Sequence, residues 1–339
     1  MKAALKAMVL VAAELTGVTA IVRGSRWRSQ RVLVLCYHGV SRADEHRWNP
    51  ELYVTPEHLR RRFSALRELG ATVLPLGEAL QRCRDGTLPP RAVAITFDDG
   101  ASNFASHAVP ILREFGFPGT VYVTTYYVIH QFPVWNIAAR YIEWATRRGP
   151  APDPSVIGRL IGGDTARPNA GRIAMLDTFL RQWQSRGAAD QDGAVHELAR
   201  ALGFDDRVMR ESRMWHLMTP EQVAGLPRDL VSVQLHTHRH RQPQDWPGYA
   251  AEVEENRDVL QRLLGYRPVH FCYPSGEVHP QFPEYLARLG IESATTCVPG
   301  LLAPRGNLRL VPRLIDTMLT PDSTFRAWVA GTGALLTRA

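Results

Sequence analysis

The chain has 339 residues, of which 45% are hydrophobic, so it can bury a large core and disorder of the whole chain is excluded. The excess of Lys and Arg gives a formal net charge of +7, which is compatible with nucleic acid, an anionic membrane surface or an acidic substrate as partner. Four cysteines without any CxxC spacing favour buried free thiols and a reducing compartment over disulfides.

The first thirty residues form the first predicted element. An apolar run from Ala7 to Val22, interrupted by one acidic residue, is preceded by Lys2 and Lys6 and followed by four arginines between residues 23 and 31. The run is shorter than the roughly 20 apolar residues of a spanning helix, and no convincing cleavage site follows it. The basic flanks favour an interfacial helix lying on a membrane. A helix packed on the protein's own domain is the alternative.

Strand and helix patterns alternate from residue 31 onward. Apolar runs typical of strands occupy Arg31–Tyr37, Ala92–Phe97, Gly119–Thr125, Val231–Leu235, Val269–Tyr273 and Ile291–Thr296. Helical spacing of apolar residues covers Thr55–Leu69 and about 102–115 and 249–264. The alternation predicts an α/β fold with a parallel sheet, either an open doubly wound sheet or a barrel, with the chemistry at the carboxyl ends of the strands.

The strand rhythm stops between residues 134 and 218. Helical stretches replace it at Ile137–Arg147, Ile173–Arg186 and Gly193–Leu202, joined by links rich in Pro and Gly. We expect a helical insertion here that shapes the access of substrate to the functional site. The alternative is an insertion that only packs on the rest of the protein, distant from that site. The predicted organisation is an N-terminal helix (1–30), a main domain (31–320) with the insertion at about 134–218, and a C-terminal helix or tail (321–339).

Two acids and two histidines follow predicted strands. Asp98 and Asp99 come directly after Ala92–Phe97, and His236 and His240 come after the strand that ends at residue 235. One acid and two imidazoles supply the three protein ligands of a mononuclear divalent metal site, and the second acid is then free to take a proton. An Asp-Asp-Gly sequence is also common as a helix cap and turn, and a His pair beside arginines is often a surface cluster. Their shared position at one end of a sheet favours the metal site.

Nucleic-acid binding is disfavoured. The basic residues do not interleave with aromatic residues along one segment, as a surface that stacks bases requires.

Three motifs in order carry a resemblance to a known family. The sequences Thr96-Phe97-Asp98-Asp99-Gly100, His236-Thr237-x-x-His240 and Phe271-Cys272-Tyr273-Pro274-Ser275-Gly276 resemble the first three motifs of the NodB-like polysaccharide deacetylases, carbohydrate esterase family 4. The resemblance spans about residues 31–316. It implies a distorted, incomplete (β/α) barrel and a divalent metal used to remove N- or O-acetyl groups from sugars. The start Tyr37-His38 is similar to the subgroup that includes deacetylases of poly-N-acetylglucosamine.

The resemblance implies a role for each motif residue. It makes Asp98 the general base and Asp99, His236 and His240 the ligands of the metal, Zn²⁺ in the first place, with Co²⁺ or Ni²⁺ as alternatives. The backbone N–H of Ser275 would stabilise the oxyanion.

The residues around these motifs have expected roles as well. The neighbours of Ser275, which are Tyr273, Pro274 and Gly276, would contact substrate. Thr237 would fix the loop between the histidines by a hydrogen bond, and His238 would point away from the metal.

Two positions depart from the family pattern. Cys272 stands where many members have an arginine that orients the base, so Asp98 must be oriented by another group. The late motif that usually supplies a histidine as general acid has none here. We expect His38 to be the general acid or a substrate contact, with His279 as runner-up, while Arg313 would bind substrate or help to hold the acid cluster.

The expected function is metal-dependent hydrolysis of the N-acetyl group of an amino sugar in a surface polysaccharide, its precursor or a lipid-linked sugar. One alternative is hydrolysis of another small acyl amide or non-peptide C–N bond, such as a formamide, at the same site. A non-catalytic glycan-binding protein is the other, and the intact ligand set argues against it. The expected location is cytoplasmic and peripheral at the inner face of the membrane, with a periplasmic or extracellular protein on an uncleaved N-terminal anchor as the alternative.

Overall fold

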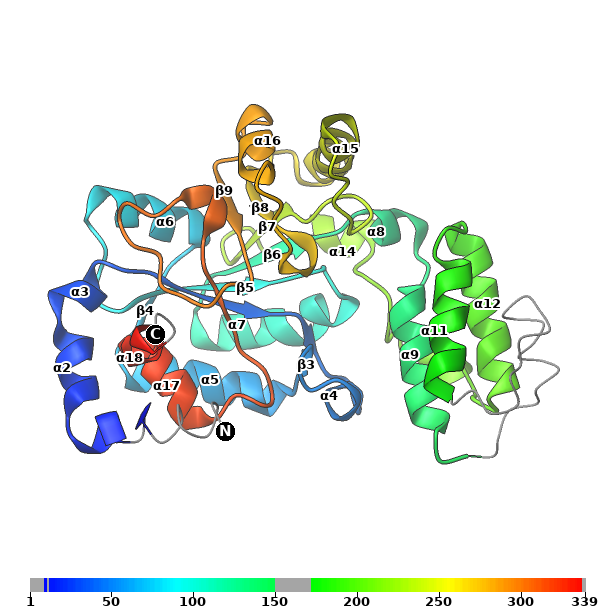
Figure 1. Ribbon diagram of the computed structural model, residues 1–339, viewed down its shortest axis with the longest axis horizontal. Helices are drawn as coiled ribbons and strands as arrows, with labels where there is room; N and C mark the ends of the chain where they lie inside the picture. The colour runs from blue at the N-terminus through cyan, green and yellow to red at the C-terminus, as the bar shows by residue number, and fades with distance from the viewer. Residues whose placement is uncertain (1–8, 11, 150–171, 337–339) are drawn as a thin grey trace. The chain divides into compact units, whose positions relative to one another are not determined.

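The computed structural model describes residues 9–10, 12–149 and 172–336 of the chain (Figure 1). Part of the expected N-terminal run, with Lys2, Lys6 and Ala7, lies outside the described residues, as do 150–171 of the expected insertion and 337–339 of the expected tail. Two compact units are present, Met1–Tyr126 with Pro220–Ala339, and Tyr127–Thr219.

The first unit is built on a parallel sheet. Its strand order is β10-β1-β5-β6-β7-β8-β9, with β4 also paired to β5, and a small parallel pair, β2-β3, lies apart from it. The six expected strands are all present, and β5 and β7 have the expected bounds. The strands are β1 (Leu33–Tyr37), β2 (Gly39–Val40), β3 (Tyr53–Val54), β4 (Thr72–Val73), β5 (Ala92–Phe97), β6 (Gly119–Val123), β7 (Val231–Leu235), β8 (His270–Cys272), β9 (Ser293–Thr295) and β10 (Leu314–Ile315).

The sheet curls because both of its edges meet one segment of chain, residues 311–316. Val311 forms a parallel bridge with Thr295 of β9, and three residues later Leu314 pairs with Leu35 of β1. This junction brings the last strands back to the first. The expectation of an incomplete (β/α) barrel is therefore confirmed, and the open sheet is excluded.

The strands at the centre of the barrel explain the continuous apolar runs of the sequence. All five side chains of β1 and all six of β5 are buried, because parallel strands are covered on both faces. Helix α5 (Pro56–Glu68) begins where expected, since the Thr55 side chain accepts a hydrogen bond from the His58 N–H (3.0 Å) and proline occupies the first helical position.

The other helices of the first unit flank the sheet (Figure 1). Helix α6 packs against β5 and α15 packs against β7. The helices expected at about 102–115 and 249–264 are confirmed as the η1-α7 pair and α15. The elements are α2 (Val18–Gly24), α3 (Arg26–Ser29), α4 (Glu45–Trp48), α6 (Leu76–Asp85), η1 (Phe104–Ala108), α7 (Val109–Phe115), α14 (Pro220–Ala224), α15 (Trp246–Leu264), η2 (Pro274–Gly276), α16 (Phe282–Arg288), η3 (Leu308–Leu310), α17 (Asp322–Ala330) and α18 (Thr332–Leu335).

The second unit consists of helices in its described part. The three expected helical stretches are confirmed as α9 (Trp135–Thr146), α11 (Arg172–Trp183) and α12 (Ala188–Ala201), which pack on one another. Two short helices, α8 (Tyr126–His130) and α13 (Arg207–Glu211), complete the described helices of this stretch. A role of the unit in substrate access stays a prediction.

Among the described residues, no helix has both the length and the apolar content needed to cross a membrane.

Candidate functional site

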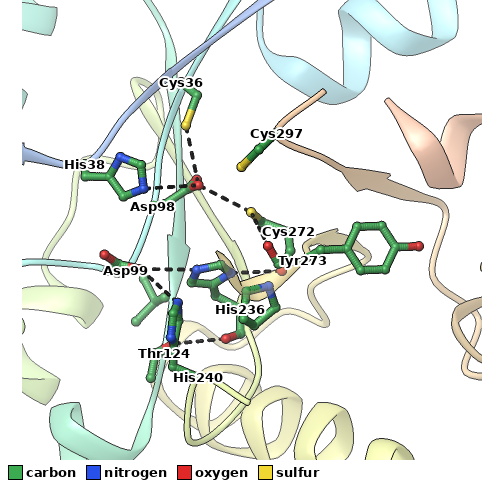
Figure 2. A network of polar contacts seen from close by, with 12 residues as sticks. Cys36, His38, Asp98, Asp99, Thr124, His236, His240, Cys272, Tyr273 and Cys297 are labelled. Carbon is green, nitrogen blue, oxygen red and sulfur yellow. Dashed lines mark hydrogen bonds and ion pairs between the residues drawn. The ribbon is translucent and has the colours of Figure 1, made fainter. Parts of the chain in front are cut away.

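The motif residues meet at the carboxyl ends of the barrel strands (Figure 2). Asp98 and Asp99 directly follow β5, His236 directly follows β7, and Cys272 ends β8. Because the strands are parallel, their carboxyl ends lie at the same end of the barrel. The barrel thus brings together residues that are up to 174 positions apart in the sequence.

Asp99, His236 and His240 form a compact donor set. The Asp99 Oδ1 atom lies 3.2 Å from His236 Nε2 and 3.4 Å from His240 Nε2. The three ligand atoms all lie within 4.8 Å of one another. Asp99 and His240 adopt positive φ angles of 71° and 56°, a conformation that costs free energy in non-glycine residues and clusters at functional sites.

The orientation of His236 fits a metal ligand. Its Nδ1 donates a hydrogen bond to the Cys272 carbonyl oxygen (2.8 Å), which leaves Nε2 as the electron-pair donor on the side of Asp99. Its backbone N–H donates to Asn256 Oδ1 (2.9 Å) and its carbonyl accepts from Thr124 Oγ1 (2.9 Å). One carboxylate and two oriented imidazoles are a donor set that suits a divalent transition metal such as Zn²⁺.

The loop between the two histidines is fixed differently from expectation. The Thr237 hydroxyl is buried and has no hydrogen-bond partner among the described residues, so its expected hydrogen bond is wrong. Thr124 and Asn256 hold the start of the loop instead. His238 points away from the donor set, as expected, since its Nδ1 shares a hydrogen bond with Thr125 Oγ1 (2.8 Å).

Asp98 lies beside the donor set and is held by Arg313. Both side chains are buried, and the guanidinium contacts both carboxylate oxygens, Nη1 to Oδ1 and Nη2 to Oδ2, each at 2.7 Å. Burial alone would raise the pKa of Asp98, but the charge and hydrogen bonds of Arg313 outweigh it and hold the pKa well below its usual range. Asp98 is therefore ionised at neutral pH in a fixed orientation.

Arg313 is itself fixed by the barrel junction. Its Nε donates to the Thr296 carbonyl oxygen (2.9 Å) and its Nη1 to Thr96 Oγ1 (3.2 Å). Its side chain is completely buried, and its expected contact with substrate stays a prediction. The alternative role, holding the acid cluster, agrees with the contacts.

Two thiols complete the surroundings of Asp98. The Sγ atoms of Cys36 and Cys272 each lie 3.4 Å from Asp98 Oδ2, and Cys272 Sγ lies 3.1 Å from Arg313 Nη2. Burial raises the pKa of Cys36 well above its usual value, so it is a protonated hydrogen-bond donor to the carboxylate. All four cysteines of the chain are free, which confirms the expectation of free thiols, and Cys297 is the one that is only partly buried.

His38 and His279, the two histidines considered as general acid, have different surroundings. His38 Nε2 lies 4.0 Å from Asp98 Oδ2, and 18% of its side chain is exposed (Figure 2). It thus reaches the site from the end of β1 without belonging to the donor set. His279 has its Nδ1 close to the Gln281 N–H (3.4 Å) and its ring against Phe282. The geometry favours His38 over His279 as the candidate for the general acid.

The third motif places its backbone, more than its side chains, at the site. Ser275 is exposed with φ 57°, and its backbone N–H has no hydrogen-bond partner within the described part of the chain. Tyr273 is buried, and its hydroxyl donates to the Arg309 carbonyl oxygen (2.9 Å). Its expected contact with substrate stays a prediction. Pro274 is buried as well, and its carbonyl oxygen accepts from Gln242 Nε2 (3.0 Å).

Gly276 closes this turn and needs to be glycine. It has φ 69°, and a Cβ at this position would overlap the Cys297 side chain. Its expected role in substrate contact stays a prediction.

Comparisons with known proteins agree with this geometry. The model of the polysaccharide deacetylase family matches residues 85–151 and 196–294. A curated protein of Escherichia coli strain K12, poly-β-1,6-N-acetyl-D-glucosamine N-deacetylase, is 32% identical over 93 residues. That segment covers 27% of this chain and 14% of the relative.

Two solved structures share the fold. The Streptococcus pyogenes deacetylase PplD in complex with acetate superposes with a TM-score of 0.55 at 17% identity, covering 86% of this chain and 94% of that one. IcaB from Ammonifex degensii gives a TM-score of 0.55 at 18% identity, covering 90% and 97%. At these identities the likeness establishes the barrel fold.

Proposed function

The chain belongs to the polysaccharide deacetylase family, and we propose that it hydrolyses the N-acetyl group of an amino sugar in a surface polysaccharide, its precursor or a lipid-linked sugar. The observation that carries this proposal is the arrangement of the two acids. Asp99 joins both histidines in one donor set, while Asp98 comes close to His236 only together with the Cys272 thiol, and is held by Arg313. The family and the similarity to the Escherichia coli poly-β-1,6-N-acetyl-D-glucosamine N-deacetylase support an acetylated amino sugar as the substrate class.

A divalent metal would be held by Asp99, His236 and His240. Zn²⁺ suits this set best, and Co²⁺ or Ni²⁺ also accept imidazole and carboxylate ligands. When bound, such a metal would supply a Lewis acid able to polarise the acetyl carbonyl and to make water more acidic.

Asp98 is proposed as the general base. It accepts the proton of the water that attacks the acetyl carbonyl carbon, and its bidentate pair with Arg313 sets the direction in which its oxygen atoms face. The pair keeps the carboxylate ionised over the neutral range, so the base form is always present. The same pair lowers its basicity, so orientation is its main contribution to the rate.

His38 is proposed as the general acid. An imidazole can carry a proton near neutral pH and give it to the amino-sugar nitrogen as the C–N bond breaks. Its Nε2 lies 4.0 Å from Asp98 Oδ2, so proton uptake and proton donation take place next to each other. The backbone N–H of Ser275 is the proposed donor to the oxyanion.

The test is release of acetate by the purified protein, stripped of metal and then reloaded with Zn²⁺, Co²⁺ or Ni²⁺. Substrates are β-1,6-linked and β-1,4-linked N-acetylglucosamine oligomers and lipid-linked N-acetylated sugars, each with its N-formyl analogue. Acetate released only after reloading is the expected result. Formate release alone would move the activity to formamides, and bound metal without release from any substrate would contradict the proposal.

A further inference from the structure

Exposed apolar side chains gather near the N-terminus. Ten large aliphatic side chains are exposed among the described residues, and four of them lie between residues 9 and 21. Leu15 is 82% exposed and Ile21 is 73% exposed, while Val9 and Val18 are each more than 40% exposed. Scattered apolar residues on a surface are ordinary, but a local group of them marks an interaction site.

Helix α2 carries two residues of this group, Val18 and Ile21, and is itself held on the first unit. It packs against α17 and α18, and its Thr19 side chain is buried. The next helix is tied down by Arg28, which is buried and donates from Nε to the Val329 carbonyl oxygen (2.9 Å). Val18 and Ile21 lie three residues apart on α2, which places them on one side of that helix, while Leu15 precedes α2 and is separated from it by Gly17, which has φ 76°. One side of α2 therefore packs on the domain, and the Val18 and Ile21 side chains stay exposed.

The charges beside the apolar group are mainly positive. Arg23 lies in the last turn of α2, and Arg26 opens α3 and is exposed. Glu14 is the one acidic residue among the described residues from 9 to 31. An apolar helix face flanked by arginines suits the interface of an anionic bilayer, where the apolar side chains enter the acyl boundary and the guanidinium groups meet lipid phosphates.

We propose that this N-terminal face, defined as Leu15, Val18 and Ile21 with Arg23 and Arg26, binds the surface of an anionic lipid bilayer. The helix lies on the bilayer. This inference does not depend on the proposed catalytic activity, because its evidence is exposure, packing and charge outside the metal site. The cytoplasmic location expected from the free thiols stays a prediction.

The test is co-sedimentation of the full-length protein with vesicles of phosphatidylcholine alone or of an equimolar mixture with phosphatidylglycerol. We expect binding to the anionic vesicles, and a loss of about tenfold or more in the partition coefficient for Ile21→Asp. The matched control is Ile173→Asp, because Ile173 on α11 is 72% exposed and Ile21 is 73% exposed. The control should bind like the wild type. Replacing Arg23 and Arg26 by glutamate should weaken binding to the anionic vesicles.

Three outcomes would overturn the proposal. The first is a wild-type protein that stays in the supernatant with anionic vesicles. The second is equal loss for Ile21→Asp and Ile173→Asp. The third is a wild-type dimer, seen by analytical ultracentrifugation, that Ile21→Asp converts to a monomer without changing vesicle binding, because the apolar face would then be covered by a second copy of the chain. Thermal unfolding of each variant is the check that these exposed substitutions leave the fold intact.

Discussion

Replacement of Arg313 tests the link between the barrel junction and the acid pair. Arg313→Ala removes a buried guanidinium that contacts Asp98 twice at 2.7 Å, Thr296 at 2.9 Å and Thr96 at 3.2 Å. Loss of one partner of a buried ion pair costs about 3–5 kcal/mol, since the other charge stays buried without compensation. That is a large part of the roughly 5–15 kcal/mol by which a domain is stable. Arg313→Lys is therefore the working variant, because it keeps the charge beside Asp98 while it loses the two-point contact and the guanidinium hydrogen bonds to Thr296 and Thr96.

The pH dependence gives the direction of the effect. In the wild type, Arg313 holds the pKa of Asp98 below the usual range of an aspartic acid. The ion pair therefore stabilises the fold when the pH lies above that range, and this stabilisation is lost only when strong acid protonates Asp98. With the two-point contact weakened, burial raises the pKa of Asp98 toward neutrality. The acidic limb of the pH profile of kcat/KM should move to higher pH in Arg313→Lys, and kcat should fall about 10²-fold because the carboxylate is no longer oriented.

The assay is acetate release across pH at equal metal content, together with urea unfolding. The matched control is Arg62→Lys, because Arg62 is another buried arginine of the same unit and contacts Asp316 (2.9 Å) and Asp322 (2.5 Å), away from the proposed base. It should lose stability while its acidic limb stays in place. Wild-type turnover together with an unchanged acidic limb in Arg313→Lys would refute the positioning role of Arg313. An equal shift of the acidic limb in Arg62→Lys would show that the effect comes from lower stability of the fold and not from the orientation of Asp98.

Further predictions concern the other residues of the site. Asp99→Ala and His236→Ala should lose bound metal and turnover together, as measured by metal analysis of the purified variants, and retention of a full metal equivalent would disprove the donor set. His38→Ala should keep its metal and lose about 10²–10⁴-fold in kcat, whereas unchanged kinetics on a responsive substrate would move the acid role elsewhere. A thiol reagent should modify Cys297 first in the native protein, since the other three cysteines are buried; early modification of Cys36 would show that the site opens.

The parts of the fold that follow from local sequence were predictable. β5 and β7 coincide with their apolar runs, because strands buried on both faces leave an uninterrupted apolar signal. The acids and the first histidine directly follow these runs, so the parallel order alone brought them to one end of the sheet. The position of the donor set could therefore be predicted from two features of the sequence, the ends of the strands and the spacing of the motifs.

The parts that depend on barrel closure were not predictable. Arg313 reaches Asp98 because residues 311–316 join β9 to β1, a contact between the two ends of the sheet that leaves no local pattern. Asn256 fixes His236 from the middle of α15, where a polar residue on a buried helix face is the one signal in the sequence. The burial of Tyr273 likewise arises from its packing against Phe282, since a motif shows which backbone is needed but not where each side chain points.

A comparison of wild-type protein with Asp98→Asn tests the proposed division of roles between Asp98 and Asp99. Both are loaded with Zn²⁺, and bound metal and acetate release from the responsive amino sugar are measured on the same samples. We expect nearly equal bound metal and a loss of most turnover in Asp98→Asn, because Asp98 lies outside the set of Asp99, His236 and His240 and is proposed to take the proton of the attacking water. Metal lost in parallel with activity, or turnover retained by Asp98→Asn, would contradict the division of roles between the two acids.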